Sequence, residues 1–290
     1  MGPRMGTDRG TRFLIPLVVV MGLTSLYPTL YSLYMSFFDW DWGKQFDFIG
    51  LGNYQTLLSS ERFHIALWNT FVFTASAVCI QLFLGMGLAL VVDRLGRGAG
   101  FVRAILLVPL MVSGIVVALI WKILLDPTLG PVSLVLRQVG IGPLGFLGDP
   151  AMGMASVVLI DTWWQTAFVF IVLSAGLQAL PHEPQEAAEV DGANSLQRLR
   201  YITLPMLKPI ILVILLFRTI DCLKVFAIIF GTTGGGPLTT TESVQVLAYR
   251  ASFKQQGLSL AMTMMVVFAV IVLAVVLVYQ RLGATRETVQ

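Results

Sequence analysis

Long apolar runs separated by polar connections dominate this chain of 290 residues. A hydrocarbon layer of about 30 Å is crossed by about 20 helical residues at 1.5 Å per residue. We therefore predict an all-α integral membrane protein that forms a single membrane domain over residues 1–290. Six stretches are long enough for membrane-spanning helices: 13–37, 66–92, 103–125, 152–179, 209–230 and 258–280.

The first apolar stretch follows three arginines and runs from Phe13 to about Phe38. The apolar region of a signal peptide has about 7–15 residues and is followed by a small-residue cleavage site. This stretch is longer and has no such site, so we predict a retained span. Pro109 lies inside the third stretch, where neighbouring helices can satisfy the backbone group that it frees.

Composition agrees with the apolar runs. Hydrophobic residues make up 56% of the chain and charged residues 12%, against about 25% charged residues in soluble domains. The basic residues are scattered and form no dense patch of the kind that binds nucleic acid. Cys79 and Cys222 both lie in apolar runs without a CxxC or Cys/His cluster, so we expect two small buried side chains and no metal site.

The basic residues between the apolar stretches predict an orientation. Eleven of the nineteen Lys and Arg residues lie in the N-terminus, 93–103, 180–208 and the tail, and six lie in the opposite connections. Cytoplasmic loops carry the excess of Lys and Arg. Both termini and the loop 181–208 are therefore predicted to be cytoplasmic.

The loop 181–208 contains signals for a first short helix. Pro184 suits a first helical turn, and Glu183 and Glu186 favour a helix N-terminus. Gly192 permits the backbone reversal that ends a helix after Val190. The sequence thus predicts a short helix and then a turn.

A second short helix is predicted from about Ser195 to Ile202, with Leu196 and Leu199 on its apolar face. Pro205 and Pro209 are predicted to break it before the fifth span. The loop would then be a helix-turn-helix at the cytoplasmic surface that exposes small alanines and acidic groups. This shape suits insertion into a cleft on a partner protein, and it equally suits a surface helix anchored by snorkelling side chains.

The same loop contains the pattern E-A-A-x3-G-x9-I-x-L-P, formed by Glu186, Ala187, Ala188, Gly192, Ile202, Leu204 and Pro205. In this it resembles the permeases of binding-protein-dependent ABC importers. The resemblance implies that the helix-turn-helix docks into a cytoplasmic ATPase and couples ATP hydrolysis to transport. The residues that it assigns to this coupling are Glu186, Ala187, Ala188, Asp191, Gly192 and Ala193. Leu199 departs from the Phe that is common in sugar permeases but preserves the apolar face.

Shorter stretches resemble the carbohydrate branch of that family, which includes maltose, trehalose and glycerol-phosphate permeases. They are Tyr27-Pro28, Ser36-Phe37, Phe48 to Tyr54, Asn69-Thr70 and Gly234 to Pro237. The glycine run at Gly234 lacks the Lys-Ser/Thr of a phosphate-binding loop. The resemblance therefore implies that ATP and Mg²⁺ are bound by a separate ATPase and that this chain itself carries no cofactor and is not an enzyme.

The resemblance also implies partners and a location. They are a second related permease subunit, two cytoplasmic ATPase subunits, an external solute-binding protein and the lipid bilayer of a bacterial or archaeal plasma membrane, with no nucleic acid. The solute would be a disaccharide or oligosaccharide moved by alternating access.

Charged residues inside the fifth span are costly, at about 2.5–3.5 kcal/mol each at a helix centre. Arg218, Asp221 and Lys224 are spaced by three and lie on one side of that helix. Asp221 can pair with either neighbour. The cluster is interpreted as an ion-pair group that fixes helix packing, as a lining of the solute path, or as both.

The fourth span contains Asp161, Trp163, Trp164 and Gln165 close together. Aromatic faces pack on the C–H faces of sugars, and carboxylate and amide groups bind hydroxyls. Adjacent tryptophans on a helix point about 100° apart, so we expect at most one to face a cavity. Helix packing and interface anchoring remain an alternative role for this group.

Three other functions account for fewer of these features. A glycerol-phosphate or polyol permease would use Arg218 and Lys224 for an anionic solute, but Asp221 offsets their charge. An ion-coupled secondary transporter would explain the buried charges but not the coupling loop. A membrane enzyme is disfavoured because no nucleophile–base or metal constellation is present in the sequence.

Overall fold

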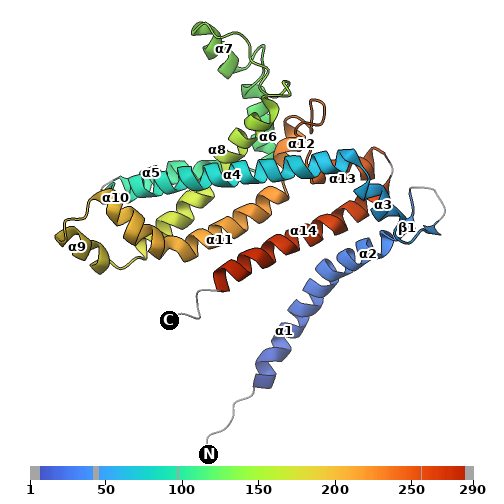
Figure 1. Cartoon of the computed structure of the whole chain (residues 1–290), viewed down its shortest axis with the longest axis horizontal. Coiled ribbons are helices and arrows are strands. Elements are labelled where there is room, and N and C mark those ends of the chain that lie inside the picture. Colours follow the sequence, from blue (N-terminus) through green and yellow to red (C-terminus); the bar gives the residue numbers. More distant parts are fainter. Residues whose placement is uncertain (1–6, 42–45, 97, 256, 285–290) are drawn as a thin grey trace, which may run out of the picture. The chain divides into compact units, whose positions relative to one another are not determined.

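Figure 1 shows a computed structural model of the chain, whose regular structure is almost entirely helical. It describes residues 7–41, 46–96, 98–255 and 257–284. The chain divides into two compact units, residues 1–63 with 247–271 and residues 64–246 with 272–290. The predicted all-α class is confirmed apart from one small antiparallel pair of strands, β1 (Phe38–Asp39) and β2 (Asp47–Phe48).

Four of the six predicted spans are present as long apolar helices. The stretches that could cross a membrane are Leu14–Met35, Glu61–Asp93, Gly153–Gln178 and Leu258–Arg281. The first consists of α1 (Thr7–Met21), the π-helix η1 (Gly22–Leu26) and α2 (Tyr27–Met35). The other three are α4 (Glu61–Asp93), α8 (Gly153–Gln178) and α14 (Leu258–Ala284).

The third predicted span is a broken helix and not a continuous one. It consists of α5 (Ala99–Leu107), the 3-10 turn η2 (Val108–Met111) and α6 (Gly114–Leu124), with a bend of 95° between its two halves. Pro109 has no backbone N–H for the helical ladder. Val112 and Ser113, which directly follow η2, adopt extended conformations.

The fifth predicted span begins earlier than expected. Helix α11 (Leu204–Leu223) follows the π-helix η3 (Leu199–Thr203) without a gap, and a short α12 (Ala227–Gly231) comes after a break. The prediction that Pro205 and Pro209 break the helix before the fifth span is wrong. Pro205 lies in the first turn of α11, directly after η3, and Pro209 is accommodated within the helix.

Helix α11 is not among the four apolar helices because it carries Lys208, Arg218 and Asp221. Six spans therefore stay a prediction.

Shorter helices lie between the long ones: α3 (Gly52–Leu58), α7 (Pro131–Gln138), α9 (Glu183–Val190), α10 (Ser195–Arg198) and α13 (Val244–Phe253). Four basic residues of the orientation argument lie outside the described residues: Arg4, Lys44, Arg97 and Arg286.

In the first unit, side chains bonded to backbone carbonyls tie the strand pair to its neighbours. The Asn53 amide donates to the carbonyls of Ser36 (3.0 Å) and Phe38 (2.8 Å). The Ser259 hydroxyl donates to the Trp40 carbonyl at 3.0 Å, which joins the start of α14 to the end of β1.

In the second unit, α8 is the central helix and packs on α4 and α11. A β-carbon on Gly85 of α4 would lie 2.6 Å from the Val169 side chain. One on Gly176 of α8 would lie 2.6 Å from Ile210 of α11. Small residues allow transmembrane helices to approach closely, so these two glycines bring the three helices together.

Candidate functional site

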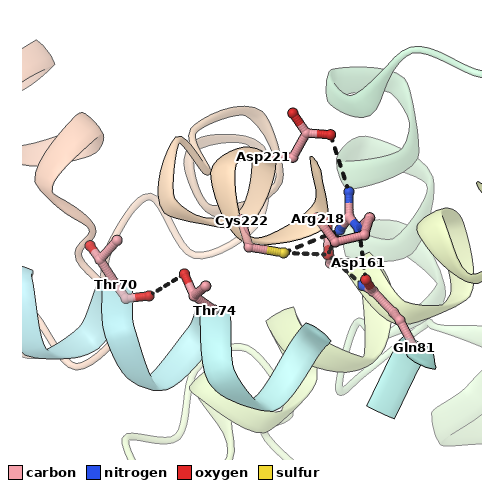
Figure 2. A network of polar contacts seen from close by, with 7 residues as sticks. All are labelled: Thr70, Thr74, Gln81, Asp161, Arg218, Asp221 and Cys222. Atoms are coloured by element: carbon pink, nitrogen blue, oxygen red, sulfur yellow. Dashed lines mark hydrogen bonds and ion pairs between the residues drawn. The ribbon is translucent and has the colours of Figure 1, made fainter. Parts of the chain in front are cut away.

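The first candidate site is built on Arg218 of α11. Its side chain is only 2% exposed. Its Nη2 lies 3.0 Å from Oδ2 of Asp161 on α8, and its Nε donates to Oε1 of Gln81 on α4 at 2.8 Å. Figure 2 shows the guanidinium held between these groups. A buried charge persists only when it is paired and hydrogen-bonded, and Arg218 meets both conditions.

Gln81 completes the cluster because its Nε2 also donates to Asp161 Oδ2, at 2.8 Å. One amide thus accepts from the arginine and donates to the carboxylate, which links three helices through hydrogen bonds. Sequence reasoning missed Gln81. The available signal was that it is an amide inside the apolar stretch 66–92, where a polar side chain requires a partner.

Asp221 and Lys224 are exposed, in contrast to Arg218. The Asp221 carboxylate is 58% exposed and lies 3.5 Å from Arg218 Nη1. The expected pairing of Asp221 with Arg218 therefore exists, but Asp161 makes the shorter contact from a buried position. Cys222 is buried with its sulfur 3.2 Å from Arg218 Nη2, whereas Cys79 is exposed, so the prediction of two buried cysteines is wrong for Cys79.

The three charged residues predicted in the fifth span, Arg218, Asp221 and Lys224, line one cavity of about 440 Å³. The polar residues predicted in the fourth span line the same cavity, apart from Trp163. Its lining includes Asp161, Trp164, Gln165, Arg218, Asp221, Lys224 and Phe226. The volume is in the range of small-molecule sites. The structure thus brings together groups from two spans that sequence reasoning had singled out separately.

Only one of the two adjacent tryptophans faces this cavity, as the helical spacing predicted. Trp164 lines it and donates from Nε1 to the Val112 carbonyl at 3.1 Å, at the break in the third span. A β-carbon on Gly114 would lie 2.7 Å from the Trp164 ring, so glycine makes room for the indole. Trp163 is 47% exposed and meets Trp121 edge to face, with ring centroids 5.6 Å apart.

The second candidate site is the helix-turn-helix formed by α9 and α10, near the end of α4 (Figure 1). Gly192 has φ +79° and ends α9 as predicted, in a conformation that glycine adopts at low cost. The Ala193 N–H then donates to the Ala188 carbonyl at 2.9 Å. Asn194 begins α10 with a capping box that it shares with Gln197.

The exposed face of this motif carries most of the predicted coupling residues. Glu186, Ala187, Asp191 and Gly192 are exposed, and Ala188 and Ala193 are half-buried. Glu189 and Arg198 join the two short helices through an ion pair of 2.8 Å. An exposed ion pair of this kind contributes about 0–1 kcal/mol to stability. The turn at Gly192 is therefore the main determinant of how α9 and α10 are arranged.

The two candidate sites are connected by a helical path. α10, η3 and α11 follow one another directly from Ser195 to Leu223. This path begins at the turn after α9 and contains Arg218 near its far end. The helix-turn-helix and the cavity are therefore joined by covalently continuous helix.

The fold and these two sites define a polytopic membrane permease. Residues 47–284 match the family described as binding-protein-dependent transport system inner membrane component. The chain belongs to this family, which confirms the resemblance drawn from the loop 181–208. It is an inner-membrane transport component, and the expectation that it is not an enzyme agrees with this membership.

Named relatives cover nearly the whole chain. The trehalose/maltose transport system permease protein MalF of Thermococcus litoralis is 34% identical, over 96% of this chain and 94% of the relative. The sn-glycerol-3-phosphate transport system permease protein UgpA of Agrobacterium fabrum is 31% identical, over 89% of each. A chain in the crystal structure of a bacterial alginate ABC transporter, in complex with an alginate pentasaccharide-bound periplasmic protein, is 25% identical with a TM-score of 0.84, over 98% and 96% of the two chains.

Proposed function

We propose that the chain is the permease subunit of an ATP-binding-cassette importer for a sugar, in particular a disaccharide or oligosaccharide. The choice of a sugar as the solute rests on the charge balance of the cavity. Asp161 and Asp221 offset Arg218 and Lys224, so the formal charges of its lining sum to zero. A neutral solute suits such a lining better than an anion does.

The other lining groups fit a sugar. Trp164 and Phe226 supply aromatic surface for C–H faces, and Gln165 supplies both a donor and an acceptor. Asp221 and Lys224 are exposed within the lining and are available for hydroxyls, whereas Arg218 is occupied by Asp161 and Gln81. We assign solute contact to Trp164, Gln165, Asp221 and Lys224, and positioning to Asp161 and Arg218. Trp163 is not in this lining and is therefore not among the residues that we assign to solute contact.

We propose six spans with both termini in the cytoplasm. The broken pair α5–α6 and the charged α11 would supply the two spans beyond the four apolar helices. The cavity would shield the charges of α11 from lipid, since charged residues in spans generally face a bundle interior or water. The excess of basic residues in the connections assigned to the cytoplasm supports the orientation.

The proposed partners are a second related permease subunit, two cytoplasmic ATPase subunits and an external solute-binding protein. ATP and Mg²⁺ would be bound by the ATPases. The exposed α9, with Glu186, Ala187 and Asp191, would dock into the ATPase, and the helical path from α10 to α11 would transmit its movement to the cavity. Binding of the partners shifts the permease between inward-open and outward-open states only if they bind the two states differently.

Uptake experiments with three labelled solutes test the choice of solute. Cells that express the complete transporter are given radiolabelled trehalose, maltose or sn-glycerol 3-phosphate in turn. We expect accumulation of at least one disaccharide and none of the phosphate ester. Accumulation of sn-glycerol 3-phosphate alone would overturn the sugar assignment and favour the glycerol-phosphate alternative.

A further inference from the structure

A polar pocket lies where α4 and α8 end, beside the helix-turn-helix. Its volume is about 320 Å³, and its polar lining consists of Asp93, Arg94, Gln185, Ser195, Arg198 and Thr203. Arg94 directly follows α4, and Arg198 is the last residue of α10. We call this hollow the α4–α10 pocket. The six residues assigned to ATPase coupling are not in its lining, so coupling does not account for it.

The charge of this lining favours an anion. Two arginines stand against one aspartate, so the formal charge is +1, whereas the lining of the solute cavity is neutral. Arg94 is exposed, and its side chain has no ion-pair partner in the part of the chain that the structure describes. Arg198 uses Nη1 for a contact of 2.8 Å to Glu189. An arginine has five N–H donors, so both guanidinium groups have donors left for a ligand.

The other polar groups of the pocket suit a phosphate. The planar fork of arginine matches the oxygens of carboxylates and phosphates, and a phosphate has more oxygens to satisfy. The hydroxyl of Ser195 and the amide of Gln185 lie in the same lining and supply further donors. Four side chains from three segments can thus donate to one anion.

The rest of the lining is apolar and lies at the ends of two long helices. It consists of Leu90, Leu177 and Leu199, of which Leu177 is buried and the other two are half-buried. Leu90 and Leu177 belong to the last turns of α4 and α8. With the proposed orientation, this is the cytoplasmic end of both spans. Basic pockets between membrane helices at this level bind lipid headgroups.

We propose that the α4–α10 pocket binds a phosphate group, which is carried by an anionic phospholipid or by a soluble phosphate ester. Arg94 and Arg198 bind its oxygens, and the leucines accommodate the apolar part of a lipid. Because Glu189 already bonds Arg198, the phosphate competes with Glu189 for this guanidinium. The proposal goes beyond the proposed function, since it adds a site for an anion to a cavity for a neutral solute.

Equilibrium binding to the complete transporter in detergent tests the proposal. Radiolabelled phosphatidylglycerol, phosphatidylcholine and inorganic phosphate are supplied in turn, and the bound label is counted. Because charge-assisted hydrogen bonds are the strong ones, we expect Arg94→Gln/Arg198→Gln to weaken phosphatidylglycerol binding about tenfold or more. The matched control is Arg200→Gln, which removes the same charge from η3 outside the lining and should bind as the wild type does.

The two sources of the phosphate give different results. Binding of phosphatidylglycerol that the double variant loses, without binding of phosphatidylcholine, identifies a lipid site. Binding of inorganic phosphate alone that the double variant loses identifies a soluble ligand. Phosphate bound by the ATPases is removed from the comparison because both transporters contain them. Equal binding of all probes by the wild type and the double variant, or an equal loss in Arg200→Gln, would overturn the proposal.

Glu189→Gln provides a gain of affinity, which damage to the fold cannot produce. The variant releases Arg198 from an exposed ion pair, and such pairs are weak, so we expect the phosphate probe to bind about threefold more tightly. Unchanged or weaker binding would overturn the placement of the ligand at Arg198. Binding is counted directly and not through uptake, so a failure of this proposal is seen separately from a failure of the importer assignment.

Discussion

The carboxylate of Asp161 and the guanidinium of Arg218 lie 3.0 Å apart although 57 positions separate the two residues in the chain. Both side chains are almost completely buried. The pair fixes α8 against α11, which are the two helices that supply the charged lining of the cavity. The same ion pair therefore lines the cavity and holds together the two helices on either side of it.

We predict that Asp161→Ala destabilises the protein by about 3–5 kcal/mol, because removal of one partner leaves a buried charge uncompensated. Asp161→Asn should cost less, since an amide oxygen can still accept from Arg218. Thermal unfolding of the detergent-purified chain measures both. The matched control is Asp221→Ala, which removes an exposed carboxylate 3.5 Å from the same arginine and should cost at most about 1 kcal/mol. Equal losses at the two aspartates would contradict the assignment of Asp161 as the main partner.

The two adjacent tryptophans should behave differently in transport. Trp164→Ala removes an aromatic wall of the cavity and a hydrogen bond to Val112, so we expect at least a tenfold loss of sugar uptake. Trp163→Ala alters a residue outside that cavity and should leave the solute KM unchanged. Uptake kinetics of both variants at matched expression check this. A larger change of KM in the Trp163 variant would show that the wrong face of α8 has been assigned to the solute.

Gly192 should tolerate asparagine but not valine. The residue has φ +79°, and a β-carbon there would meet no atom within 4 Å, so the cost comes from backbone strain alone. That strain is about 1–2 kcal/mol for an ordinary residue and less for asparagine. We expect Gly192→Val to reduce uptake and ATPase assembly while membrane insertion is preserved. Wild-type uptake in this variant would remove the coupling role from the turn.

Glu186 should contribute a charge-assisted contact to the ATPase of about 1.5–3 kcal/mol. It is exposed on α9 and has no ion-pair partner among the described residues. Glu186→Lys should therefore reduce the ATPase that co-purifies with the chain about tenfold or more, without a comparable loss of expression. Glu61→Lys makes the same charge change at the start of α4 and serves as the control. Co-purification of the Glu186 variant at wild-type stoichiometry would refute the contact.

The features predicted best from sequence were those governed by local rules. The length of the apolar runs located the four long helices, and Gly192 with Pro184 located the first arm of the helix-turn-helix. The break at Val112–Ser113 was missed because Pro109 alone does not determine whether a helix bends or continues. At Pro205 and Pro209 the outcome is the opposite, because the helix continues through both prolines.

The pairing within the cluster could not be derived from one helix. Spacing on α11 placed Arg218 beside Asp221, and this contact exists at 3.5 Å. The shorter contacts come from Asp161 and Gln81 on two other helices, and their approach depends on close packing at Gly85 and Gly176. Long-range packing of this kind leaves no periodic signal in the sequence.

A measurement of the energy source for uptake tests most directly whether the chain belongs to an ATP-driven importer. The chain is reconstituted into proteoliposomes with its second permease, ATPase and solute-binding protein, and uptake of radiolabelled maltose or trehalose is measured with ATP inside and with ionophores that abolish Na⁺ and H⁺ gradients. The account predicts uptake that requires ATP and the binding protein and is insensitive to the ionophores. Uptake that proceeds without ATP and is abolished by the ionophores would contradict it and identify an ion-coupled secondary transporter.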